Sequence, residues 1–208
     1  MTVAVFLDRD GVINENRADH VIHPDDVRLV PGALGALALF ARVGLPCYVV
    51  TNQAIVGRGV LSQPALDSIH HSISEAVRRA GGAIAGFYYC PHTPEQQCTC
   101  RKPLPGLLQQ AADDHDLDLT RCYLIGDALS DVQAAQAAGC TPILVRTGRG
   151  LTQMLHEDAR HLRGYYVAAH PRQAARWIVQ RERSDAPGHP LHALAALLAG
   201  RRRSLKLV

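Results

Sequence analysis

Short apolar runs alternate with longer helix-forming segments along most of this chain, and no other feature constrains its fold more tightly. The apolar runs have the length of buried strands and cover residues 3–7, 46–50, 84–89, 122–125, 141–145 and 165–168. Between them, stretches with helix start and stop signals predict helices over residues 31–43, 62–80, 104–114, 129–138 and 171–183. Such alternation indicates βαβ units. We therefore expect an α/β fold: a doubly wound, mostly parallel sheet with helices on both faces.

The length of the chain predicts one compact domain. With 208 residues, 47% of them apolar, it is long enough to bury a real core, and we expect the domain to span residues 1–183. Residues 184–208 differ, because a linker-like stretch there precedes an apolar run and three arginines. Two readings of this tail remain open: a short helix packed on the domain, which we favour, or a basic segment that contacts a membrane or a partner.

Charge and the apolar pattern argue against several classes of function. A net charge of +3 and an aromatic content of 5% are too low for a nucleic-acid-binding surface. The first residues lack the pattern of a secretory signal, and no apolar run reaches the ~18 residues that span a bilayer. We therefore expect a cytoplasmic monomer that acts on a small molecule and binds neither nucleic acid nor a membrane.

Polar residues with chemical potential follow three of the predicted strands. Asp8, Thr51 and Asp127 each stand at or just beyond the carboxyl end of an apolar run. In open parallel sheets, ligands bind at this edge. The coincidence predicts an active site formed by these three strand ends.

The first strand leads into Asp8-Arg9-Asp10-Gly11. Two carboxylates separated by one residue can divide their work, one attacking or binding metal while the other transfers protons. A carboxylate can also act as a covalent nucleophile toward phosphorus. The alternative is a pair of solvated turn residues, since Asp-Gly is a common turn dipeptide.

Two further segments offer groups that bind phosphate oxygens. Thr51, Asn52 and Gln53 supply a hydroxyl, backbone N–H groups and amides, although a polar loop after a strand is often only a loop. Arg101 and Lys102 supply a bidentate guanidinium and a compact ammonium. Lysine is rare in this arginine-rich chain, which indicates that arginine would not serve at position 102.

The fourth strand leads into residues 126–131, which contain Asp127 and, four residues on, Asp131. Oxygen ligands from Asp8 and Asp127, together with a backbone carbonyl, suit Mg²⁺, which usually retains several waters. The alternative is that Asp127 caps the following helix.

Three cysteines and one histidine gather in a loop of eleven residues. They are Cys90, His92, Cys98 and Cys100. Three thiolates and an imidazole match a closed tetrahedral zinc site, which is structural because no position is left for water. A redox disulfide and free thiols are the alternatives. We expect zinc to rigidify the loop that leads directly into Arg101 and Lys102.

Taken together and in this order, the motifs resemble the haloacid-dehalogenase-like phosphatase superfamily. In that pattern an Asp-x-Asp loop is followed by a Thr or Ser, a Lys and a Gly-Asp-x-x-x-Asp segment, and here the match runs from residue 6 to residue 131. The resemblance implies a Rossmann-like domain without a large cap, since no long insertion separates the motifs. It also implies a Mg²⁺-dependent phosphatase in which Asp8 forms an aspartyl-phosphate and Asp10 is the general acid and base.

The other predicted site residues take supporting roles. Thr51 and Lys102 would stabilise the charge of the transferring group, and Asp131 would orient Lys102 or a metal-bound water. The expected ligands of Mg²⁺ are the carboxylates of Asp8 and Asp127 and the backbone carbonyl of Asp10. The expected substrate-binding residues are Asn52, Gln53, Arg58 and Arg101.

The cysteine-containing loop narrows the resemblance. It is similar to the subgroup that contains D-glycero-D-manno-heptose 1,7-bisphosphate 7-phosphatases and histidinol-phosphate phosphatases. Several segments favour the heptose type, namely residues 10–14, 30–32, 56–59 and 144–148. An enzyme of this type would hydrolyse the 7-phosphate of the heptose bisphosphate. The short gap between His92 and Cys98 instead resembles the histidinol type. A catalytically inactive zinc-binding interaction module is the alternative of another class, and the retention of all the catalytic residue types argues against it.

Overall fold

A computed structural model describes residues 2–185 and contains a six-stranded, wholly parallel sheet. Its strand order is β3-β2-β1-β4-β5-β6. The strands are β1 Val5–Leu7, β2 Cys47–Asn52, β3 Gly86–Cys90, β4 Tyr123–Gly126, β5 Thr141–Val145 and β6 Tyr166–Ala168. The predicted fold class is confirmed, and the strands lie within two residues of their expected bounds.

Seven α-helices accompany these strands within the described residues. They are α1 Ala33–Arg42, α2 Ala54–Gly57, α3 Gln63–Arg79, α4 Gly106–His115, α5 Leu129–Ala138, α6 Gly150–Leu155 and α7 Pro171–Asp185. Short 3₁₀ turns cover Pro24–Asp26, Pro94–Gln96, Leu119–Arg121 and Glu157–Arg160. The five predicted helices are present, and Ser62 caps α3 by accepting a hydrogen bond from the amide of Ala65 at 3.3 Å. Helices α2 and α6 were not predicted, because four to six residues carry no helical periodicity.

The predicted tail, residues 184–208, falls almost entirely outside the described residues. Among residues 2–185, no helix combines the length and the hydropathy that crossing a bilayer requires.

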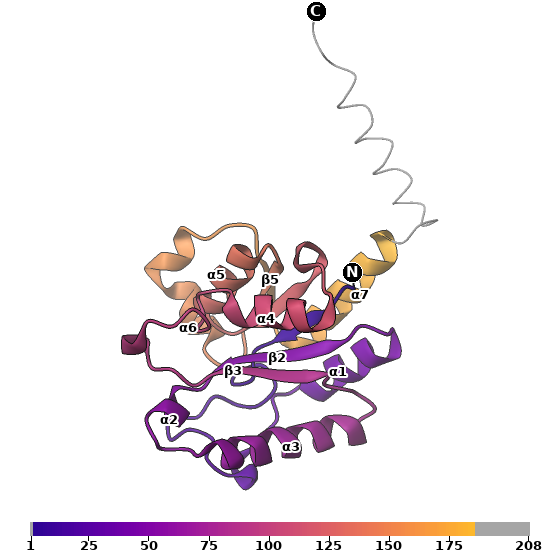
Figure 1. The fold of residues 1–208 in the computed structure, drawn as a ribbon. Coiled ribbons are helices and arrows are strands. Elements are labelled where there is room, and N and C mark those ends of the chain that lie inside the picture. The colour runs from indigo at the N-terminus through magenta and orange to yellow at the C-terminus, as the bar shows by residue number, and fades with distance from the viewer. Residues whose placement is uncertain (1, 186–208) are drawn as a thin grey trace, which may run out of the picture.

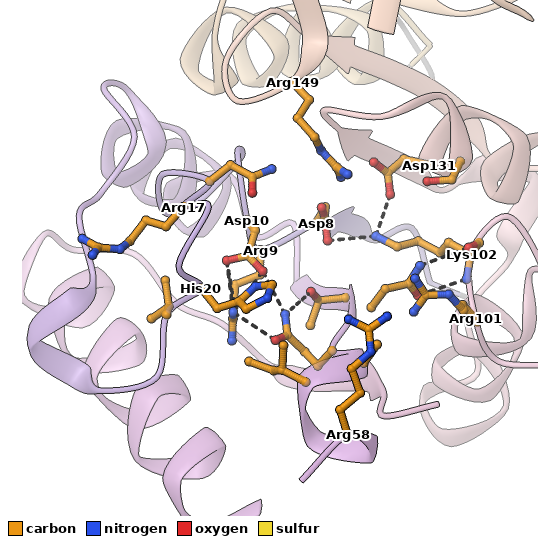
Figure 2. A pocket seen from close by; sticks show the side chains of 18 residues that line it. Asp8, Arg9, Asp10, Arg17, His20, Arg58, Arg101, Lys102, Asp131 and Arg149 are labelled. Atoms are coloured by element: carbon orange, nitrogen blue, oxygen red, sulfur yellow. Dashed lines mark hydrogen bonds and ion pairs between the residues drawn. The ribbon is translucent and has the colours of Figure 1, made fainter. Parts of the chain in front are cut away.

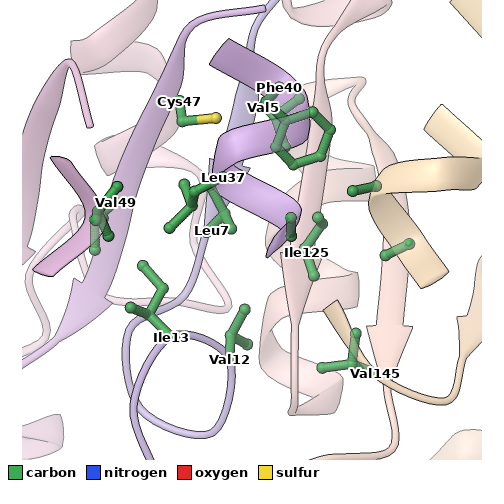
Figure 3. Packing of buried hydrophobic residues seen from close by; sticks show 14 of the residues in the cluster. Val5, Leu7, Val12, Ile13, Leu37, Phe40, Cys47, Val49, Ile125 and Val145 are labelled. Carbon is green, nitrogen blue, oxygen red and sulfur yellow. The ribbon is translucent and has the colours of Figure 1, made fainter. Parts of the chain in front are cut away.

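The sheet is covered on both faces (Figure 1). Helices α1, α3 and α7 pack on one face, and α4 and α5 pack on the other. Strand β1 divides its side chains accordingly: Val5 and Leu7 belong to the first core cluster, and Phe6 belongs to the second. Figure 3 shows Val5 and Leu7 beside Leu37 and Phe40 of α1. Burial on both faces explains why this strand is apolar throughout.

The crossover connections reverse direction at β1. Helices α1 and α3 link β1 to β2 and β2 to β3 on one face, whereas on the other face α4 links β3 back to β4 across β1, and α5 links β4 to β5. Strands β2 and β4 pair with opposite edges of β1, so the strand order reverses there. The carboxyl end of β1 is therefore the topological switch point where such folds bind ligands. The residue at that point is Asp8.

His70 on α3 is a buried titratable group close to this region. Its ring stacks on Phe87, with centroids 4.2 Å apart and planes 13° from parallel, and its Nε2 has no hydrogen-bond partner among the described residues. Burial, with a further contribution from the charge of Arg9, lowers the pKa of His70 from 6.5 to about 3. The unfolded chain therefore binds a proton at this histidine at a higher pH than the folded chain does.

We predict that His70 makes the fold sensitive to mild acid. Between pH 6.5 and 5 only the unfolded state gains the proton, so the free energy of unfolding falls by about 2 kcal/mol through this residue. The variant His70→Phe should lose less stability over that range in urea titrations at pH 7.5 and 5. The exposed neighbour His71 provides the control, because His71→Gln should keep the pH dependence of the parent protein. If the free energy of unfolding fell equally between pH 7.5 and 5 in the parent protein and in His70→Phe, the prediction would be contradicted.

Candidate active site

Asp8 is fixed where β1 ends. Its amide donates to the carbonyl of Ile125 at 2.9 Å, and the residue is only 5% exposed. The chain then turns sharply through Gly11, whose φ of 88° favours glycine. A Cβ at Gly11 would collide with the carboxylate of Asp127, so this turn can approach the neighbouring strand end only without a side chain. The local sequence thus brings Asp8 and Asp127 to one edge of the sheet, as predicted.

Lys102 lies between two of the carboxylates (Figure 2). Its Nζ is 2.8 Å from Asp8 Oδ1 and 2.6 Å from Asp131 Oδ1, and it also donates to the carbonyl of Val50 at 2.8 Å. Burial alone would lower the pKa of Lys102, but the two carboxylates outweigh it and raise the pKa above its usual value. Lys102 is therefore a permanently charged, buried counter-ion.

The site nevertheless contains an excess of buried negative charge. Burial, opposed by Lys102 and reinforced by Asp131 and Asp10, raises the pKa of Asp8 to about 6. Burial and the charge of Asp8 also raise the pKa of Asp127. Carboxylate oxygens of Asp8, Asp127 and Asp131 lie within 4.8 Å of one another. This crowded, oxygen-only donor set fits a hard divalent cation such as Mg²⁺.

The side chain of Asp10 is held away from Asp8 by a separate network. It accepts hydrogen bonds from Arg9, from Asn14 Nδ2 at 2.8 Å and from Gln53 Nε2 at 2.9 Å. Burial would raise the pKa of Asp10, but the charge of Arg9 and the amide hydrogen bonds lower it below its usual value. Asp10 is thus a carboxylate in this arrangement.

The polar residues after β2 bind mostly to other site residues. Asn52 donates to the carbonyl of Lys102 at 3.0 Å and accepts from its amide at 3.1 Å. Gln53 donates to both Asp10 and Thr51 Oγ1, the latter at 2.9 Å. The hydroxyl of the fully buried Thr51 lies in the same network. Asn52 and Gln53, predicted as substrate-binding residues, therefore also position their neighbours.

Asp131 has a structural role beside its contact with Lys102. Its Oδ2 accepts from the amide of Ala128 at 3.0 Å, so the start of α5 is capped by Asp131, and the alternative of a cap by Asp127 is wrong. A Cβ at Gly126 would collide with the Asp131 side chain. Glycine at the end of β4 therefore lets this carboxylate approach the sheet.

The predicted zinc ligands converge at the end of β3, which Cys90 closes, and in the loop that follows it. Cys90 Sγ lies 3.5 Å from Cys98 Sγ, which lies 3.5 Å from Cys100 Sγ, and His92 Nδ1 lies 3.2 Å from Cys100 Sγ. Ligand atoms at these separations are close to the edges of a tetrahedron with metal–sulfur bonds of about 2.3 Å. The donor set thus fits a zinc ion, and all six cysteines of the chain are free thiols.

A pocket of about 400 Å³ opens above Asp8 and Lys102. Besides Arg9 and Lys102, its lining includes five side chains that carry or can carry positive charge, namely Arg17, His20, Arg58, Arg101 and Arg149. Of these, Arg58 and Arg101 were predicted from the sequence. Arg17, His20 and Arg149 were missed, and only Arg149 had a signal, because it directly follows the segment 144–148.

Comparisons with known proteins agree with this geometry. Residues 99–174 match a family model described as HAD-hydrolase-like. The chain is 40% identical over 146 residues to the D-glycero-beta-D-manno-heptose-1,7-bisphosphate 7-phosphatase of Bordetella bronchiseptica, covering 70% of this chain and 82% of that protein. The enzyme of the same name from Pseudomonas aeruginosa is 37% identical over 147 residues, covering 71% and 83%.

A solved structure extends the likeness to the fold. The D,D-heptose 1,7-bisphosphate phosphatase from B. bronchiseptica, complexed with magnesium and phosphate, superposes with a TM-score of 0.80 at 35% identity, covering 87% of this chain and 99% of that one. Sequence identity at this level over most of a relative's length establishes the family. The chain belongs to the haloacid-dehalogenase-like phosphatases, in the group that contains the D-glycero-D-manno-heptose 1,7-bisphosphate 7-phosphatases.

Proposed function

We propose that the protein is a Mg²⁺-dependent phosphatase that hydrolyses the 7-phosphate of D-glycero-D-manno-heptose 1,7-bisphosphate through a covalent intermediate on Asp8. The observation that carries the proposal is the buried Asp8 carboxylate at the switch point, paired with Lys102 and close to Asp127. The relatives' names supply the substrate.

Asp8 acts as the nucleophile. One of its carboxylate oxygens attacks phosphorus in line, an O–P bond forms, and the bond from phosphorus to the 7-oxygen of the sugar breaks. Asp10 gives its proton to that sugar oxygen. Water then attacks the aspartyl-phosphate, Asp10 accepts a proton from it, and inorganic phosphate leaves with Asp8 regenerated.

The protonation state of Asp10 sets a condition on this sequence. The charge of Arg9 and the hydrogen bonds from Asn14 and Gln53 keep Asp10 ionised, which suits the second step. The first step needs a proton on Asp10, and the negative charge of an arriving phosphate monoester favours its uptake.

The surrounding residues stabilise charge during transfer. Lys102 and the Thr51 hydroxyl would contact the transferring phosphoryl oxygens, and Asp131 keeps Lys102 in place. Asp8, Asp127 and the backbone carbonyl of Asp10 would hold Mg²⁺, which supplies electrostatic neutralisation of the phosphate when bound.

We call the positively charged lining formed by Arg17, His20, Arg58, Arg101 and Arg149 the cationic rim. This rim would give the pocket its affinity for a bisphosphate. Arg58 is exposed and lines the pocket, and Arg101 is tied to the zinc loop through a hydrogen bond to the carbonyl of His92 at 3.2 Å. Both guanidiniums would contact the substrate beyond its reacting phosphate. None of the six cysteines is paired in a disulfide, which supports a reducing, cytoplasmic setting.

Arg58 provides a test of this rim. In Arg58→Gln, kcat/KM for the heptose bisphosphate should fall by about tenfold, because a charge-assisted contact with the distant phosphate is lost. Turnover of 4-nitrophenyl phosphate, which has no second phosphate, should stay within about twofold of the parent enzyme. Equal losses on both substrates would contradict the assignment.

Removal of zinc should impair both stability and turnover. The variant Cys98→Ser should contain less metal, melt several degrees lower and lose at least about tenfold in kcat/KM, because the loop that carries Lys102 is no longer fixed. Metal content, melting temperature and phosphate release measure the three effects. Cys140→Ala removes a buried thiol outside the cluster and should leave the zinc content unchanged. A metal-free protein with full activity would contradict a zinc-stabilised loop.

The substrate and the nucleophile can be tested together. In the presence of Mg²⁺, kcat/KM for one anomer of the heptose bisphosphate should be about a hundredfold higher than kcat/KM for histidinol phosphate. Phosphate release measures both constants. Asp8→Asn should lower kcat by roughly 10³-fold or more without unfolding, whereas the exposed Asp158→Asn should change nothing. A preference for histidinol phosphate would overturn the heptose assignment, and an active Asp8→Asn would overturn the mechanism.

A further inference from the structure

Arg149 binds the carboxylate that the proposed function assigns to the metal. Its Nη2 lies 3.2 Å from Asp127 Oδ1, and its backbone amide donates to Asp127 Oδ2 at 2.8 Å. The two partners differ in burial, because the side chain of Asp127 is 0% exposed and that of Arg149 is 55% exposed. The guanidinium therefore covers a buried carboxylate from the pocket side, where Figure 2 shows it pointing toward Asp8 and Asp131.

This ion pair and a divalent cation compete for the charge of the same carboxylate. The single negative charge of the Asp127 carboxylate stabilises either a guanidinium or a divalent cation alone better than it stabilises both at once. Two positive groups side by side would also repel each other. The half-exposed side chain of Arg149 can move into the pocket, whereas the buried Asp127 cannot move away.

The backbone of the same loop is held independently of this side chain. Thr147 Oγ1 donates to the carbonyl of Gly11 at 2.7 Å, and Gln153 Oε1 accepts from the amide of Leu129 at 3.0 Å. Gly148 is packed so closely against Gly11 and Asp127 that a Cβ would collide with both. The position of the Arg149 backbone thus stays fixed when its side chain changes partner.

We propose that Arg149 exchanges partners during the catalytic cycle: it neutralises Asp127 in the metal-free enzyme and, once a cation displaces it, contacts the phosphoryl group bound at Asp8. This inference rests on the proposed function and adds a substrate-contacting residue to it. The guanidinium fork suits both partners, since it binds carboxylate and phosphate oxygens with the same geometry. The exchange reduces the excess negative charge of the site before the metal binds and leaves an arginine free for the substrate afterwards.

The proposal predicts opposite effects on two affinities that are measured without turnover. Arg149→Gln should bind Mn²⁺, a paramagnetic stand-in for Mg²⁺, about fivefold more tightly, because no guanidinium has to be displaced. In the Mn²⁺-saturated protein the same variant should bind inorganic phosphate about tenfold more weakly. Electron paramagnetic resonance of free Mn²⁺ and calorimetry with phosphate give the two constants.

Arg146→Gln is the matched control, because it removes the same charge from an exposed position three residues away that does not line the pocket. It should leave both affinities within about twofold of the parent protein. Unchanged or weaker Mn²⁺ binding in Arg149→Gln, unchanged phosphate binding, or equal effects in Arg146→Gln would each overturn the exchange. If both affinities shift as expected but no phosphatase activity is found, the proposed function fails and the exchange stands.

Discussion

The buried ion cluster of Lys102 with Asp8 and Asp131 is the interaction on which the rest of this structure depends. Charges in an interior are costly unless they are paired and hydrogen-bonded, and here Nζ lies within 2.8 Å of both carboxylates and of a backbone carbonyl. Removal of Lys102 would leave two buried carboxylates without their counter-ion, at a cost of about 3–5 kcal/mol. The cluster therefore forms only when β1, the start of α5 and the segment after the cysteine-containing loop are all in place.

The other local features serve that assembly. Asn52 holds the backbone of Lys102, Asp131 caps the helix from which it reaches the lysine, and Gly11 and Gly126 let strand ends approach where a Cβ would not fit. What remains is an excess of negative charge, and burial together with this charge raises the pKa of both Asp8 and Asp127. The same excess favours a divalent cation, so the crowding of carboxylates is the property that would make the site bind metal and then phosphate.

The sequence predicted those features that depend on local pattern. Apolar runs of strand length located Asp8, Thr51 and Asp127 at one edge, because the carboxyl ends of parallel strands must meet there. The spacing of the cysteines located the cluster in the same way. The partners of individual side chains were not predictable, since they depend on packing between distant segments. Asn52 reaches Lys102 across 50 residues, and Arg149 reaches Asp127 across 22.

The central claim is that Asp8 becomes covalently phosphorylated, and direct detection of that intermediate tests it best. The enzyme would be mixed with Mg²⁺ and a saturating heptose bisphosphate, quenched in acid within milliseconds, digested and examined by peptide mass spectrometry. The account predicts a hydroxylamine-labile phosphoryl group on the peptide that contains Asp8, formed and lost at rates compatible with turnover. A phosphoryl group on another residue, or turnover with no phosphorylated peptide under conditions that trap an acyl phosphate, would contradict it.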